Sequence, residues 1–182
     1  MNRRHLLTSA SSTAVLLLSA SLVGCGSQQI TSYANEKPVL DLRTYFNGTL
    51  DAHGVFTDRS GTVVKRFTVL MQCSWQGNDG ILDEAFTYSD GTRERRIWRL
   101  TRLADGTYTG RADDVVGIAN GQQSGNTFHW SYTMALAVDG TAYEVQFDDW
   151  MYLVDNKVML NKARMSKFGI YLGEVTLSFS KR

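Results

Sequence analysis

Alternation of apolar and polar residues constrains the fold of this chain more than any other feature. The clearest run spans residues 128–138, where Phe128, Trp130 and Tyr132 alternate with polar or small residues. A period of two places every second side chain on the same face of a β-strand. The pattern therefore predicts half-buried strands. Other alternating runs lie at 63–75, 143–147 and 175–179.

Turn-forming dipeptides separate these runs, as at Asn47-Gly48, Asp90-Gly91 and Asp139-Gly140. Such residues accept the positive φ that tight hairpins need. Hairpins make neighbouring strands antiparallel, and closing the sheet removes its unpaired edges. We therefore predict an all-β fold, a single antiparallel up-and-down barrel of about 8–10 strands, with a two-sheet sandwich as the alternative. Strands are expected near 48–58, 62–74, 81–89, 94–103, 107–113, 116–122, 126–138, 141–153, 157–167 and 170–181, with one helical turn at 41–46.

The first 24 residues have the features of a bacterial lipoprotein signal peptide. Arg3 and Arg4 precede an apolar run, and Leu22-Val23-Gly24 stands directly before Cys25. Small residues suit the cleavage site, and a cysteine in this position is typical of a lipobox. We predict a signal peptide over 1–24, lipid modification of Cys25 and attachment to a membrane through that lipid. The paired arginines leave the general secretory and the twin-arginine export routes both open.

The remaining chain is predicted to contain a tether and one domain. Residues 25–39 are mostly polar and contain Pro38, the only proline, which favours a flexible tether. The barrel domain then spans 40–182. The chain has 19 Lys and Arg against 18 Asp and Glu, so it lacks the basic excess expected of a nucleic-acid partner. Cys73, the only other cysteine, is expected to be a small buried apolar residue.

Several predicted strands place charged and aromatic residues on one face. Glu84 alternates with Phe86, Arg96 with Trp98, and Asp148 with Trp150. Ligand sites are commonly apolar pockets with a few placed polar groups. We predict that Glu84, Arg96 and Asp148 point into the barrel and form one charge network that lines a cavity. The predicted ligand-binding residues are Glu84, Arg96, Trp98, Trp130, Asp148, Trp150 and Tyr152.

Adjacent carboxylates at Asp148 and Asp149 leave other interpretations open. A regular pleat would point them to opposite faces, and a bulge would turn both to one side. A structural brace with Arg96 or Arg164 is the alternative to a ligand site. His53 and His129 are far apart in sequence and form no metal-binding motif, so no metal site is predicted. No cofactor and no catalytic residue is predicted either.

Short segments of the domain resemble a proteobacterial family of lipoproteins of unknown function. The most specific are Asp148-Asp149-Trp150-Met151-Tyr152 and Lys167-Phe168-Gly169-Ile170, and the resemblance extends over about residues 40–182. It implies a lipocalin-like barrel. It also implies an outer-membrane location on the periplasmic face, because Gly26 rather than aspartate follows Cys25. It brings no catalytic residues.

Three functions are consistent with these patterns. The leading hypothesis is a membrane-anchored carrier of a hydrophobic or amphiphilic small molecule, such as a lipid or fatty acid. The second is a structural or assembly factor of the cell envelope that acts through its outer surface. The third is a lipid-modifying enzyme that uses Asp148, Asp149 or His129 as acid or base. An interior cavity of about 300 Å³ or more favours the first and third, and a filled interior favours the second.

Overall fold

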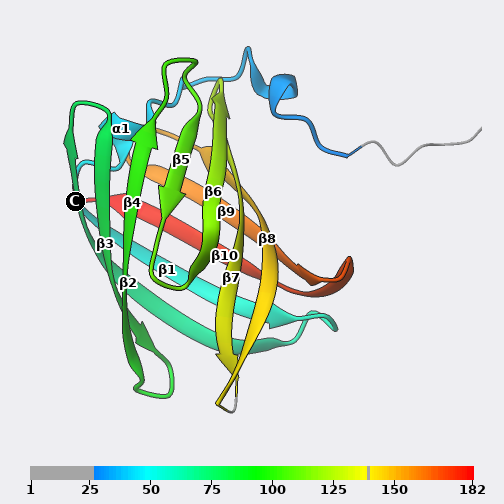
Figure 1. Cartoon of the computed structure of the whole chain (residues 1–182). Helices are drawn as coiled ribbons and strands as arrows, with labels where there is room; N and C mark the ends of the chain where they lie inside the picture. The colour runs from blue at the N-terminus through cyan, green and yellow to red at the C-terminus, as the bar shows by residue number, and fades with distance from the viewer. Residues whose placement is uncertain (1–26, 139) are drawn as a thin grey trace, which may run out of the picture.

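The alternating runs form ten antiparallel strands that close into one barrel (Figure 1). Each strand pairs with its neighbour in sequence, and β1 pairs with β10, so the predicted up-and-down barrel is confirmed. The computed structural model describes residues 27–138 and 140–182, so the predicted signal peptide and Cys25 lie outside the described residues. The strands are β1 (Gly48–Asp58), β2 (Val63–Gln76), β3 (Asp79–Tyr88), β4 (Arg93–Arg102), β5 (Tyr108–Arg111), β6 (Val115–Ser124), β7 (Thr127–Val138), β8 (Thr141–Leu153), β9 (Val158–Lys167) and β10 (Ile170–Lys181).

The hairpin turns have the chemistry that the dipeptides predicted. Between β1 and β2, the Asp58 carboxylate accepts hydrogen bonds from the backbone N–H groups of Ser60 and Thr62. Gly61 has φ of 86°, a value that glycine adopts without strain. These local contacts fix the turn between two strands and thereby their register.

A short helix closes one end of the barrel. Helix α1 (Leu42–Tyr45) is capped by the Asp41 side chain, which accepts a hydrogen bond from the Thr44 N–H at 2.9 Å. The Lys181 ammonium donates to three backbone carbonyls at the end of this helix, those of Thr44, Tyr45 and Asn47. Figure 1 shows α1 at one end of the barrel and the β1–β2, β7–β8 and β9–β10 hairpins at the other. The closed end is filled by buried apolar side chains, among them Leu40, Leu42, Phe46, Leu50, Tyr108, Met159 and Phe179.

The opposite half of the barrel is less completely filled. It contains the buried cluster Met134, Val145, Phe147, Ala163 and Met165. Around this cluster and above the filled closed end, inward-facing apolar side chains of β1, β2, β3, β7 and β10 pack on the core but are only partly buried. We call these residues the cup: Phe56, Phe67, Phe86, Leu136, Leu172, Val175 and Leu177.

Small residues on two strands make room for a large one on the next. Gly110 and Gly121 lie on the inner faces of β5 and β6, beside the Trp130 indole from β7. A Cβ atom at Gly121 would overlap the rings of Trp130 and Phe128. The indole therefore extends across the interior only because these positions have no side chain.

The segment before α1 differs from the flexible tether that its composition predicted. It contains a 3₁₀ turn, η1 (Ile30–Tyr33), which contacts β6 and β7. The Leu40 N–H donates to the Gly125 carbonyl at 2.8 Å, and the Tyr33 ring packs on Trp150. Aromatic packing and backbone hydrogen bonds outweigh the polar composition of the segment, so residues 28–40 lie against the barrel.

We expect Gly121→Ala to destabilise the barrel by about 1–3 kcal/mol, because the added methyl overpacks Trp130 and Phe128. The neighbouring Gln122 is exposed on the outer face, so Gln122→Ala should change stability by no more than about 0.5 kcal/mol. Denaturant unfolding measures both. Equal stabilities for the two variants would contradict the packing described here.

Candidate ligand site in the barrel interior

Two charged residues from neighbouring strands face each other inside the barrel. Glu84 on β3 is directly opposite Arg96 on β4 and Met71 on β2. Opposite residues of antiparallel strands share a face, and Met71 is buried in the core. The prediction that Glu84 and Arg96 point inward is therefore confirmed.

Arg96 is shared between two carboxylates. Its Nε donates to Asp114 Oδ2 at 2.8 Å, and its Nη1 lies 3.8 Å from Glu84 Oε2. The side chains of Glu84 and Arg96 are only 12% and 20% exposed. Burial raises the pKa of Glu84 to about 7, and the Arg96 charge opposes this only in part.

A third carboxylate, Asp149 on β8, lies inside without a cation partner among the described residues. It accepts hydrogen bonds from the Asn161 amide and, at 3.3 Å, from the Tyr132 hydroxyl. Both donors are neutral. Burial raises the pKa of Asp149 to about 7, because these two hydrogen bonds do not fully replace the lost hydration.

Aromatic rings surround these polar groups. Trp98 makes edge contacts with Trp130 and Tyr132 at ring-centroid distances of 5.7 and 5.3 Å. Tyr132 in turn stacks on Phe147 at 4.9 Å. On the closed-end side of this level lies a cavity of about 50 Å³, lined by residues that include Met71, Glu84, Trp98, Trp130 and Met151.

The structure separates the seven predicted site residues into two groups. Glu84, Trp98 and Trp130 face the interior and line the small cavity, and Arg96 faces the interior opposite Glu84. Asp148, Trp150 and Tyr152 do not lie inside, so the predicted inward orientation of Asp148 is wrong. The ligand-binding role of the four inner residues stays a prediction.

Asp148, Trp150 and Tyr152 belong to the outer face of β8. The Asp148 carboxylate is 57% exposed and lies 2.6 Å from the His129 Nε2, whose ring stacks on Trp150. Trp150 is buried because Tyr33 from the N-terminal segment covers it, and Tyr152 accepts a hydrogen bond from Gln28. The regular pleat of β8 places Asp149, rather than Asp148, in the barrel.

Four inner polar residues were not among the predicted site residues: Asp114, Tyr132, Asp149 and Asn161. Tyr132 and Asn161 follow the alternation of β7 and β9, so the inner face of each strand was readable from the sequence. Asp114 lies between β5 and β6, where no alternation indicates its direction.

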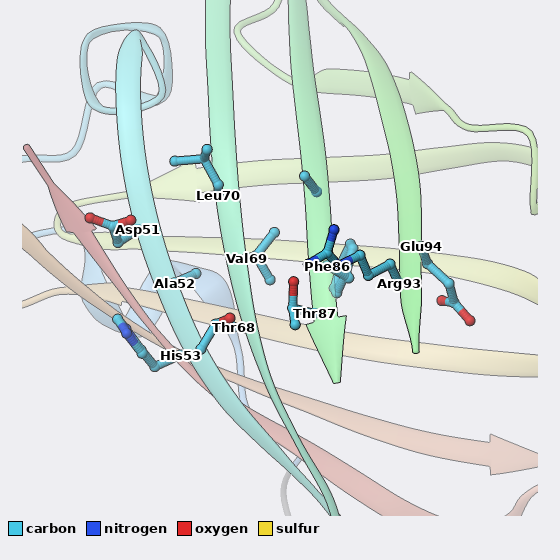
Figure 2. Close-up of a pocket in the computed structure, with 11 residues that line it drawn as sticks. Asp51, Ala52, His53, Thr68, Val69, Leu70, Phe86, Thr87, Arg93 and Glu94 are labelled. Carbon is cyan, nitrogen blue, oxygen red and sulfur yellow. The ribbon is translucent and has the colours of Figure 1, made fainter. Parts of the chain in front are cut away.

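A larger depression, of about 320 Å³, lies on the outer face across β1–β4 (Figure 2). Figure 2 shows Leu70 and Val69 projecting to opposite sides of β2, and Val69 belongs to the core. The outward side chains around the depression are Asp51, His53, Thr68, Leu70, Ala85, Thr87 and Arg93. They are of mixed character and contain no buried charge network.

The described part of the chain gives little support for a nucleophilic cysteine, a metal site or a membrane-spanning helix. Burial raises the pKa of the Cys73 thiol to about 12, which suits a packed apolar residue better than a nucleophile. Between residues 27 and 182, residue 139 aside, no three His, Cys, Asp or Glu side chains are grouped to hold a metal ion. Nor is any helix in those ranges long and apolar enough to cross a membrane.

Arg96→Met should destabilise the barrel on the order of 3 kcal/mol, because it leaves the Glu84 and Asp114 carboxylates inside without a cation. Arg95 supplies a matched control on the same strand. It forms an ion pair with Asp83 on the outer face and is 65% exposed, so Arg95→Met should cost less than about 1 kcal/mol. Thermal or denaturant unfolding distinguishes the two variants. Similar small losses of unfolding free energy in both would indicate that Arg96 is exposed to solvent.

The barrel should lose stability as pH rises between about pH 4 and about pH 7. Glu84 and Asp149 have native pKa values of about 7, above their ordinary values of 4.5 and 3.8. In this window the native state therefore holds more protons than the unfolded chain, and raising the pH favours unfolding. The contribution is complete below the unfolded pKa values and is lost by about pH 7.

Denaturant midpoints at about pH 5 and about pH 8 measure this dependence. The double variant Glu84→Gln/Asp149→Asn should reduce the difference between the two midpoints, while Asp113→Asn, at an exposed position between β5 and β6, should leave it unchanged. A wild-type midpoint that stays constant across the window would show that neither inner carboxyl group has a raised pKa.

Comparison with one solved structure agrees with this architecture. The S-type phycobiliprotein lyase CPES from Guillardia theta superposes with a TM-score of 0.59 at 7% identity, over 86% of this chain and 98% of the lyase. A de novo designed fluorescence-activating β-barrel gives a TM-score of 0.42 at 12% identity, over 79% of this chain and 99% of the design. The first likeness shows a shared lipocalin-like barrel fold.

Sequence comparison places the chain in a family. No curated protein matches it in sequence. The family model described as "Protein of unknown function (DUF3833)" matches residues 19–181, which include the whole barrel. The chain therefore belongs to the DUF3833 family.

Proposed function

We propose that this protein binds a hydrophobic or amphiphilic small molecule in the open half of its barrel. The observation that carries the proposal is the contrast between the two halves of the interior. The closed end is filled by buried side chains, whereas the cup consists of inward-facing apolar residues that remain partly exposed. Exposed apolar surface that is concave and contiguous is typical of ligand sites.

The small closed-end cavity alone cannot hold such a ligand, and it does not reach the volume of about 300 Å³ expected above of an interior ligand cavity. It measures about 50 Å³, against roughly 300–1,000 Å³ for typical small-molecule sites. The apolar body of the ligand must therefore occupy the cup. Glu84 lies at the lower boundary of the cup, because Phe86 lies on its open-end side and Leu82 on its filled-end side. A polar end group would meet Glu84 at that level.

The comparison structures support the barrel and no particular ligand. CPES is a phycobiliprotein lyase, but at 7% identity its activity does not transfer to this chain. The proposal rests on the chain's own inner residues.

The enzyme hypothesis named Asp148, Asp149 or His129 as the acid or base. His129 and Asp148 form a pair on the outer face, whereas Asp149 lies inside. Of the three candidates, Asp149 is therefore the one that faces the barrel interior. A role through the outer surface has one specific observation in its favour, the depression of about 320 Å³ across β1–β4. Ligand binding that is sensitive to inner-face substitutions distinguishes the cup from this surface.

Val175→Arg should weaken ligand binding about tenfold or more, because it places a charge among the apolar residues of the cup. Thr176 is exposed on the outer face of the same strand, so Thr176→Arg is the matched control. Titration of the full chain in nanodiscs with a neutral fluorophore such as N-phenyl-1-naphthylamine measures both, with empty nanodiscs subtracted. Circular dichroism confirms that both variants fold. Equal affinity in Val175→Arg and wild type would contradict the proposal.

The proposal includes a lipid anchor at Cys25, with the protein on the periplasmic face of the outer membrane. Ser27 is two residues from Cys25, so the lipid would be attached within about 7 Å of Ser27. The adjacent Gln28 donates a hydrogen bond to Tyr152 at the closed-end terminus of β8. The closed end would then lie next to the membrane, and the cup would open away from it.

Cys25→Ser should abolish lipid modification and release the protein from membranes, because the cysteine sulfur is the atom that carries the lipid in a lipobox. Metabolic labelling with palmitate and density-gradient fractionation measure the two effects. Continued labelling of the variant would contradict the lipoprotein assignment. Wild-type protein in the inner-membrane fraction would contradict the outer-membrane location.

A further inference from the structure

The lower boundary of the cup has an excess of negative groups. Three carboxylates, Glu84, Asp114 and Asp149, face the interior around a single cation, Arg96. Arg96 makes its closer contact, 2.8 Å, with Asp114. Asp149 has only the neutral donors Asn161 and Tyr132. Among the described residues, Arg96 is thus the one cation for three carboxyl groups at this level, and burial keeps Glu84 and Asp149 partly protonated near neutral pH.

Glu84 is the carboxylate that faces free space. It lines the small cavity, and among the described residues its side chain accepts no hydrogen bond, with Arg96 no closer than 3.8 Å. A carboxylate that is almost buried and lacks hydrogen bonds is costly unless a ligand supplies a donor. Its raised pKa, about 7, reflects the same shortage of partners.

Electron-rich rings form the walls beside this carboxylate. Trp98 and Trp130 both line the cavity with Glu84, and their rings meet edge to face. A cation near the face of an indole ring is stabilised by the ring quadrupole, most strongly where water is excluded. A carboxylate that lines a cavity together with two tryptophans suits an ammonium group better than an anion.

We infer that the ligand is an amphiphile whose polar end is a primary ammonium group, received by Glu84 beside Trp98 and Trp130. This inference rests on the proposed function, because it assigns the polar end of the molecule in the cup. The cavity of about 50 Å³ has room for a group of about the size of a water molecule, roughly 30 Å³. A trimethylammonium group is larger and fits less well.

The cations at the open rim do not change this assignment. Lys65 lies on the inner face opposite Phe56, and its ammonium pairs with Asp90 and covers the Tyr88 ring. Lys167 lies over the Tyr143 ring. Both stand at the strand ends near the hairpins, while the carboxylates lie deeper. A fatty-acid carboxylate directed to Glu84 would therefore meet like charge.

The test compares four amphiphiles with the same ten-carbon tail: decylamine, decanol, decanoate and decyltrimethylammonium. Each displaces N-phenyl-1-naphthylamine from the full chain in nanodiscs, with empty nanodiscs subtracted, at about neutral pH. We expect decylamine to bind about tenfold more tightly than decanoate, with decyltrimethylammonium weaker than decylamine. Glu84→Gln should weaken decylamine about tenfold and leave decanol within about twofold. Asp148→Asn, on the outer face, should change neither.

The outcomes separate this inference from the proposed function. If decanoate binds as tightly as decylamine, or if Glu84→Gln and Asp148→Asn have equal effects, the ammonium assignment is wrong and the carrier proposal survives. If the neutral probe and all four amphiphiles fail to bind, the proposed function is wrong, and the inference with it. If Glu84→Gln is unfolded by circular dichroism, Glu84→Asp replaces it, and its shorter side chain should also weaken decylamine selectively.

Discussion

A buried charge needs its partners close by, and the ion pairs of Arg96 organise the interior of this barrel. Arg96 reaches Asp114 at 2.8 Å and Glu84 at 3.8 Å across neighbouring strands. Removing Arg96, or removing the carboxylates that it contacts, would leave a charge that the apolar side chains around it cannot hydrate. The level of Arg96 is also where the filled closed end gives way to the cup. The charge network thus marks the floor of the candidate site.

The packing of the filled end depends on small residues that lie beside large ones. Gly110 and Gly121 leave space that the Trp130 indole occupies, and Tyr45 and Phe46 of the N-terminal turn close the end. The hydrogen bond from Trp75 Nε1 to the Phe46 carbonyl, at 2.7 Å, ties this turn to β2. Because this end is closed by the chain itself, access to the interior is from the hairpin side.

Much of the fold was readable from the sequence, because alternation and turn dipeptides are local signals. All ten strands and the helical turn at 41–46 were predicted within a few residues. The same signals gave the inward direction of Glu84 and Arg96. For Asp148 and Asp149 they left two arrangements open, opposite faces in a regular pleat or one face at a bulge, and local pattern does not decide which face is inside. Trp150 suggested that the face it shares with Asp148 is inside, which is wrong. Trp150 is buried on the outer face under Tyr33, through a contact between segments far apart in sequence.

The central claim is that ligand enters the cup and reaches Glu84, and site-directed photolabelling tests it most directly. A decylamine carrying a diazirine on its tail, irradiated with the full chain in nanodiscs, should label cup residues such as Phe67, Phe86 and Leu177. Excess unlabelled decylamine should remove that labelling, as measured by peptide mass spectrometry. Labelling confined to the outer depression, at Leu70 or Thr87, would contradict the account.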